Sequence, residues 1–117
     1  MSTVTVLRLI FETLTSRLHA AISRVCEADM NPLAETGELL RVLDLVQHAL
    51  IGAEHDPEGD TEAKRRRLKR LRAQIASLRA HNEHHVGNGP EAAYQANARI
   101  KTDDMALAMI DEVLKGL

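Results

Sequence analysis

The chain has 117 residues, of which 44% are hydrophobic but only 2% aromatic, and it carries a net charge of −2 and a single cysteine. This length predicts one domain, residues 1–117, with a modest core, and the small charge provides no overall field that would draw the chain to nucleic acid or a membrane. A core of aliphatic side chains with almost no rings favours packed helices over a β-sandwich, and one cysteine excludes an internal disulfide.

The first predicted element is a helix over residues 3–28. Its apolar residues recur at alternating steps of three and four, the heptad spacing of a helix that packs along its whole length. They are Val4, Leu7, Phe11, Leu14, Leu18, Ala21 and Val25. The stretch "TVTVLRLIF" is also rich in β-branched residues and partly alternates, so a strand is the alternative at this end. Because the helical spacing continues through the stretch, we expect a helix.

A second helix is predicted over residues 32–54. The stretch "DMNP" before it marks a turn, in which Asn31 suits the N-cap and Pro32 the first helical position. Apolar residues then follow heptad spacing again, at Leu39, Leu43, Val46, Leu50 and Ala53. The stretch "HDPEGD" ends this helix.

The third predicted helix spans residues 60–86 and ends at Gly87, which suits a left-handed C-cap. Its heptad positions are Leu68, Leu71, Ile75, Leu78, Asn82 and His85. At a core position, a buried asparagine such as Asn82 lowers stability but can fix the register and the number of partners. The alternative is that the apolar face has already ended and that Asn82 is solvated.

The last predicted helix spans about residues 103–116. Thr102 can cap it, and Asp103 and Asp104 favour the positive end of the helix dipole. Alternatively, a helix begins at Pro90 and continues, straight or kinked, to the C-terminal end. Short turns between long helices imply antiparallel neighbours. The expected fold is therefore an all-α, up-down antiparallel helical bundle with coiled-coil-like heptad seams and a C-terminal helical arm.

A basic stretch, "EAKRRRLKRLR", places seven positive charges between residues 64 and 72. Leucines interleave with these charges, so the stretch is one charged flank of an amphipathic helix. Four residues are expected to face outward together as a candidate partner-binding surface: Arg65, Arg66, Lys69 and Arg70. Acidic residues lie just upstream and no aromatic residue interleaves for base stacking. A protein partner is therefore favoured, and nucleic acid remains the alternative.

Three histidines lie close together in "HNEHHVGNG", residues 81–89. On a helix, His81, His84 and His85 are neighbours at a spacing that suits metal ligation. Further ligands would have to come from the end of the first helix, where Cys26 and Asp29 are the candidates. The favoured interpretation is a polar helix end whose histidines complement the negative pole of the dipole, so no metal or other cofactor is expected. Sensing of pH by these imidazoles also stays open.

Several apolar residues lie off the main heptad positions: Leu9, Ile10, Leu40 and Leu45. We expect them to form an exposed patch that joins two copies of the chain as a homodimer. Near the C-terminal end, Met105 and Met109 provide an adaptable apolar surface and are further candidates for partner contact.

Nothing in the sequence resembles an active site, since it has no phosphate-cradling glycine loop and no nucleophile elbow. We therefore expect no enzyme, but a non-enzymatic protein-interaction module: a small regulator, inhibitor, adaptor or chaperone that binds a partner protein. A nucleic-acid-binding regulator and a metal-binding bundle are the alternatives. The absence of a signal peptide and of a spanning stretch predicts a cytoplasmic protein. Eleven arginines against four lysines, with sixteen alanines, favour a bacterial or phage origin.

Overall fold

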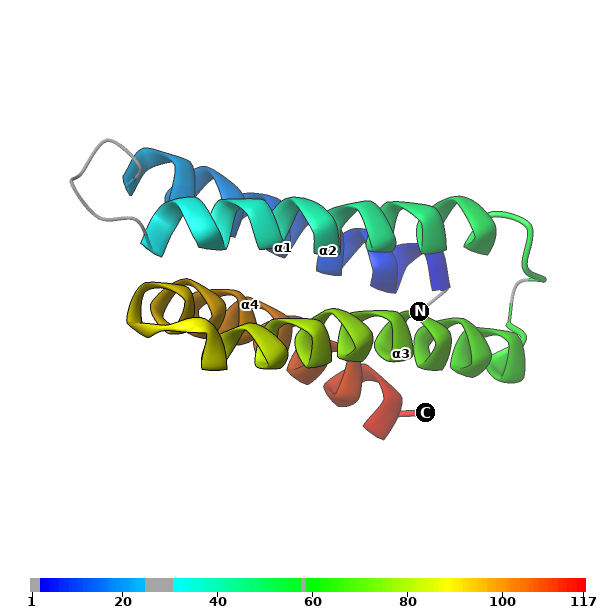
Figure 1. Ribbon diagram of the computed structural model, residues 1–117. Coiled ribbons are helices and arrows are strands. Elements are labelled where there is room, and N and C mark those ends of the chain that lie inside the picture. Colours follow the sequence, from blue (N-terminus) through cyan, green and yellow to red (C-terminus); the bar gives the residue numbers. More distant parts are fainter. Residues whose placement is uncertain (1–2, 25–30, 58) are drawn as a thin grey trace.

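The computed structural model describes residues 3–24, 31–57 and 59–117, and within them it contains four long helices and no strand. The helices are α1 (Thr3–Arg24), α2 (Asn31–Ala53), α3 (Thr61–His85) and α4 (Pro90–Lys115), and a short 3-10 helix, η1 (Val86–Asn88), joins the last two. The predicted all-α, up-down antiparallel bundle is confirmed (Figure 1). None of these helices is long and apolar enough to cross a membrane.

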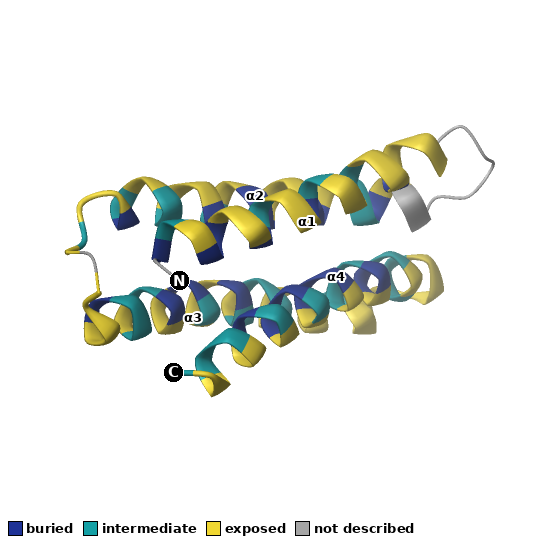
Figure 2. Cartoon of the chain, turned by 180° about the vertical axis from the view of Figure 1, so that it is seen from behind, coloured by how far each residue is buried: buried dark blue, intermediate teal, exposed yellow. Residues whose placement is uncertain are grey.

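The helices are arranged as two antiparallel pairs, α1 with α2 and α3 with α4, which lie one above the other (Figure 1). α2 packs against α4 across the two layers, whereas α1 contacts mainly α2. The described molecule measures 47 × 28 × 21 Å. Its buried residues line the space between the layers and its exposed residues face outward (Figure 2).

The buried face of α1 is formed by Leu7, Ile10, Leu14 and Ala21, each at most 3% exposed. Steps of three, four and seven place these residues on one side of a helix, which excludes the alternative of a strand at this end. The expectation that Ile10 is exposed is wrong. Ile10 follows Leu7 by three positions and precedes Leu14 by four, so it lies between them on the buried face.

Most of the heptad positions expected in the second and third helices lie in the core, but Leu50 and Leu78 are only half-buried against it and His85 is not part of it. Those that are buried are Leu39, Leu43, Val46, Ala53, Leu68, Leu71, Ile75 and Asn82. Helix α3 begins where predicted, because the Asp60 side chain accepts a hydrogen bond from the Ala63 amide at 3.0 Å. Asn82 is 2% exposed, so the interpretation that it occupies a core position is correct and the solvated alternative is wrong.

The last helix begins at Pro90 rather than near residue 103. Gly89 precedes it with φ +117°, a conformation that favours glycine, and proline suits the first helical position. Thr102 does not cap a helix, since its hydroxyl donates to the Ala98 carbonyl one turn earlier at 3.3 Å. Thr102 and Asp103 are both buried, so side chains that look like a helix start in the sequence instead belong to the interior of the bundle.

Candidate functional site

The outward face of α2 carries three large apolar side chains in line. Leu33, Leu40 and Ile51 are 50%, 54% and 52% exposed. They are seven and eleven residues apart, which at 3.6 residues per turn places them within about 20° of one line along the helix. The buried residues Val42 and Val46 lie on the opposite side of the same helix. The three side chains therefore point away from the core.

Exposed residues at heptad spacing complete this line. We call the set the outer seam: Leu33, Gly37, Leu40, Asp44, Gln47 and Ile51. Its steps of four, three, four, three and four match those of a helix that packs along a partner helix. The outer seam is hard to recognise in the sequence, because the stronger heptad pattern of the buried face already accounts for this helix. The signal that reveals it is a second, fainter pattern on the opposite side.

The four residues expected at a dimer interface do not form one patch. Leu9 is 49% exposed on α1, and Leu40 belongs to the outer seam. Ile10 is in the core, and Leu45 is half-buried against the core. The longer last helix accounts for part of the difference, because α4 begins at Pro90 and packs against both α2 and α1.

A buried polar cluster joins three helices inside the bundle. Asn82 Nδ2 on α3 donates to Glu38 Oε2 on α2 at 2.7 Å and to Asp103 Oδ2 on α4 at 2.9 Å. None of the three side chains is more than 2% exposed. Arg41 Nη1 approaches the other Glu38 oxygen at 3.4 Å. Because these groups present almost no surface to solvent, the cluster can join helices but offers no face to a substrate.

The two carboxyls of this cluster share an environment that disfavours charge. Burial, followed by a hydrogen bond and charge repulsion from Glu38, raises the pKa of Asp103 from 3.8 to about 8. With a proton bound near neutral pH, Asp103 can donate to Glu38. The Asp103 Oδ1 atom has no hydrogen-bond partner among the described residues. Sequence reasoning found Asn82 but missed both carboxyls, because a polar residue beside a heptad position gives no sign that it is buried.

Two arginines of the basic stretch are bound within the molecule. Arg67 Nε and Nη2 donate to the two Asp56 oxygens at 2.6 and 2.8 Å. This hydrogen bonding holds the pKa of Asp56 below its usual value. Arg72 makes the same type of contact with Asp111 on α4, at 2.5 and 3.2 Å. These cations therefore secure the loop after α2 and the C-terminal half of α4.

The expected outward group of four cations is only partly assembled. Arg65 is half-buried, because it pairs with Glu62 and donates from Nη2 to the Leu117 carbonyl at 3.2 Å. The other three residues of the group are exposed: Arg66, Lys69 and Arg70.

The histidines lie at the end of α3. His81 and His85 are one turn apart, with their Nε2 atoms 3.2 Å from each other and their rings edge to face. Asn88 Nδ2 lies 3.2 Å from His85 Nδ1 and orients that ring. The described residues contain no group of three or more histidine, cysteine or acidic side chains that could hold a metal ion. The expected further ligands, Cys26 and Asp29, lie outside the residues that the structure describes.

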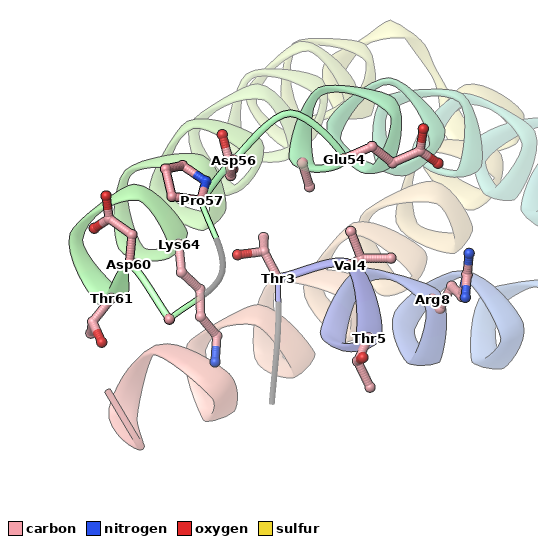
Figure 3. A pocket seen from close by; sticks show the side chains of 12 residues that line it. Thr3, Val4, Thr5, Arg8, Glu54, Asp56, Pro57, Asp60, Thr61 and Lys64 are labelled. Carbon is pink, nitrogen blue, oxygen red and sulfur yellow. The ribbon is translucent and has the colours of Figure 1, made fainter.

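Two further candidate sites are the methionines near the C-terminal end and a hollow near the start of α1. Met105 and Met109 are half-buried against the core, so they are only partly available to a partner. A hollow of about 370 Å³ lies between the start of α1 and the loop before α3. Figure 3 shows the side chains that line it. Both acidic and basic side chains line it, including Arg8, Glu54 and Asp60. None of the described lining residues is a histidine, cysteine or serine, but hydroxyl and amino groups also line the hollow, from Thr3, Thr5, Thr61 and Lys64.

Comparisons of the chain with models of protein families, with curated proteins and with solved structures give no match.

Proposed function

We propose that this chain is a non-enzymatic protein-interaction module and that its docking surface is the outer seam of α2. One observation carries the proposal: three large apolar side chains lie in line, opposite the core, each about half exposed. Single exposed leucines are ordinary on a protein surface, but a line at heptad spacing suits a helix that packs against another helix.

The free energy available at the outer seam suits reversible docking. Full burial of a leucine or isoleucine side chain is worth about 1.5–3 kcal/mol. Each half-exposed side chain of the outer seam can therefore contribute roughly 1 kcal/mol on contact with a partner. The three side chains together contribute about 3 kcal/mol to the free energy of binding that a micromolar affinity requires. Flanking polar contacts would supply the rest.

The nucleic-acid alternative has weaker support. Arg65, Arg67 and Arg72 each engage a carboxylate of the same chain. Three exposed cations remain on this part of α3, which is fewer than the six to ten phosphate contacts of a typical specific DNA-binding protein.

The docking surface can be tested with two variants that change charge equally. Leu40→Glu places a carboxylate on the outer seam, and Gln74→Glu places one at an exposed position of α3. Each full-length variant serves as bait in a lysate of the native host, and proteins retained by the wild type are then purified and titrated. We expect Leu40→Glu to weaken binding at least tenfold, about 1.4 kcal/mol, and Gln74→Glu to leave it unchanged.

Both variants must keep the helical far-UV spectrum of the wild type for the comparison to hold. If a partner binds Leu40→Glu as tightly as it binds the wild type, the outer seam is not its docking surface.

Metal binding by His81 and His85 is a second candidate, favoured by one distance. Zinc–nitrogen bonds of about 2.0–2.1 Å at a tetrahedral angle place two ligand nitrogens roughly 3.3 Å apart. The two Nε2 atoms are 3.2 Å apart. Because no third histidine, cysteine or acidic side chain of the described residues joins them in a metal-binding group, water molecules would have to complete the ligand set.

This candidate can be tested by calorimetric titration of zinc and of copper into protein that carries no histidine tag. We expect the double variant His81→Gln/His85→Gln to lose at least tenfold in affinity. The matched control is His19→Gln/His48→Gln, which removes two exposed histidines from other helices and should bind as the wild type does. Equal loss in both double variants would show that the metal binds histidines non-specifically.

A further inference from the structure

The outer seam is symmetric about the middle of α2. Counted from residue 42, Leu33 and Ile51 lie nine positions to either side, Gly37 and Gln47 five, and Leu40 and Asp44 two. In an antiparallel pair of identical helices, residues at equal distances from the two-fold axis face each other. An axis at residue 42 would therefore place every residue of the outer seam opposite another residue of the outer seam.

We infer that the outer seam binds a second copy of this chain, with the two α2 helices antiparallel about a two-fold axis near residue 42. The inference rests on the proposed function, because it takes the outer seam as a docking surface and names its occupant. In this arrangement Leu33 packs on Ile51 of the partner subunit at each end of the contact. The half-exposed apolar side chains at both ends are thereby covered.

The charges beside the axis favour this direction. Arg41 and Asp44 are both exposed, and they are held only loosely within α2, by Glu38 at 3.4 Å and by His48 at 3.7 Å. In the antiparallel pair, Asp44 faces Leu40 of the partner subunit, and the partner's Arg41, the next residue along, lies within reach of the Asp44 carboxylate. Symmetry provides the same contact twice. In a parallel pair, Asp44 would face its own copy, and like charges directly opposite repel.

Gly37 gives a second argument for close approach of another helix. It lies inside α2, where glycine is less favourable than alanine. A Cβ atom built there meets nothing within 4 Å, so packing within the subunit does not require a glycine at this position. In the antiparallel pair Gly37 faces Gln47 of the partner subunit, and a missing side chain lets the two backbones come closer.

The length of the contact predicts a reversible dimer. Residues 33–51 span about 27 Å at a rise of 1.5 Å per residue, and only one helix of each subunit takes part. Such a contact falls at the small end of specific interfaces, so the dimer should form in a concentration-dependent way. The four-helix bundle itself does not depend on it.

Cysteine cross-linking tests the direction and the register together. In the full chain with Cys26→Ser, the double variant Gly37→Cys/Gln47→Cys should form a covalent dimer on mild oxidation. Peptide mapping should find the link between positions 37 and 47. The two single variants should form little dimer, because positions 37 and 47 each lie five residues from the axis, which holds identical positions about 15 Å apart along the helix. The matched control Gln74→Cys/Asn97→Cys, at exposed positions away from the outer seam, should form no covalent dimer.

Sedimentation of the uncross-linked chain completes the test. We expect a monomer–dimer equilibrium in which Leu40→Glu raises the dissociation constant at least tenfold and Gln74→Glu does not change it. A wild-type monomer up to about 100 µM, or cross-linking of the single variants as efficient as that of the double variant, would overturn the inference. If the wild type is monomeric but Leu40→Glu still abolishes binding of another protein, the proposed function stands without the dimer. If Leu40→Glu affects neither, both fail.

Discussion

Asp103 is buried where α4 meets α2 and α3, and its pKa differs strongly from that of an exposed aspartate. Its raised pKa, about 8, means that the folded protein holds a proton that the unfolded chain releases above its ordinary pKa of 3.8. Between these two values the folded state binds more protons, so the free energy of unfolding falls as the pH rises. The stability contributed by the proton is fully present below about pH 4 and is lost as the pH passes through 8.

Asp103→Asn should therefore stabilise the protein in alkaline solution. The amide is neutral at every pH, and its oxygen can accept from Asn82 as Asp103 Oδ2 does. We expect the free energy of unfolding to rise by about 1–4 kcal/mol at pH 8 and by much less at pH 5. Urea unfolding at the two pH values measures the difference. The exposed neighbour gives the control, since Asp104→Asn should bring no gain; an equal effect of Asp103→Asn at both pH values would contradict the assignment of the proton.

At the scale of single residues, the sequence predicted only part of this cluster. Asn82 could be identified because it occupies a position that leucine or isoleucine fills elsewhere in the heptad pattern. Asp103 looked like a helix start, because local capping chemistry favours aspartate there. Whether a carboxyl is buried depends on which helices meet, and the pattern within one helix does not contain that information.

Among the elements, α2 contains two glycines with opposite surroundings. At Gly37 an added Cβ meets nothing, whereas at Gly52 it would clash with the Arg67 guanidinium. Gly37→Ala should thus raise the free energy of unfolding of the monomer by about 0.5–1 kcal/mol through helix propensity. Gly52→Ala should show no such gain, since Arg67 would have to leave Asp56. Thermal unfolding at low concentration compares them, and an equal gain in both variants would argue against the Arg67 geometry.

The loop after α2 is held by Arg67, whose removal gives a further prediction. Its guanidinium makes two hydrogen bonds to Asp56, and both side chains are largely buried. Charge-assisted contacts of this kind contribute about 1.5–3 kcal/mol, so Arg67→Gln should lower the free energy of unfolding by roughly that amount. The exposed Arg66→Gln should change it by less than about 0.5 kcal/mol. Urea unfolding of both variants at neutral pH makes the comparison, and equal losses would contradict it.

For the elements, the sequence located all four helices but misplaced the start of the last one. The first three begin within a residue or two of their predicted starts, because Pro32 and Asp60 are strong local signals. The start of α4 was placed thirteen residues too late, since the signal at Gly89–Pro90 competed with a second one at Thr102. Tertiary packing decides between two such signals, and it does so here by burying Thr102 and Asp103.

The glycine expected in a left-handed conformation after α3, Gly87, lies inside η1, and Gly89 has the positive φ instead. The predicted end of the first helix, at residue 28, lies outside the described residues.

On the scale of the whole molecule, the heptad patterns predicted an antiparallel bundle but not how its apolar faces are shared. Each helix of a pair can pack on more than one neighbour, and only the three-dimensional arrangement shows that α2 contacts α1, α3 and α4. As a result, the sequence did not predict that Ile10 is buried in the core. It also did not predict that Leu33 and Ile51 remain exposed.

The charge distribution of the folded molecule leads to the last prediction, which concerns nucleic acid. Only Arg66, Lys69 and Arg70 of the outward group are exposed, so this part of α3 can neutralise about three phosphates. The logarithm of the affinity for duplex DNA should then fall with the logarithm of salt concentration with a slope no steeper than roughly −2.7, or about 40-fold between 50 and 200 mM salt. A protein with six to ten contacts would lose about 10³–10⁵-fold over the same range. Fluorescence titration of duplex DNA and structured RNA at these two concentrations measures the slope, and Arg66→Glu/Arg70→Glu shows which part of it comes from α3. We expect the wild type to bind only weakly, because three solvated cations beside Asp56 and Glu62 cannot supply submicromolar affinity unless side chains enter a groove. Submicromolar affinity at physiological salt would therefore contradict the prediction if Arg66→Glu/Arg70→Glu abolishes it and keeps the helical spectrum. In that case α3 rather than α2 would be the functional surface.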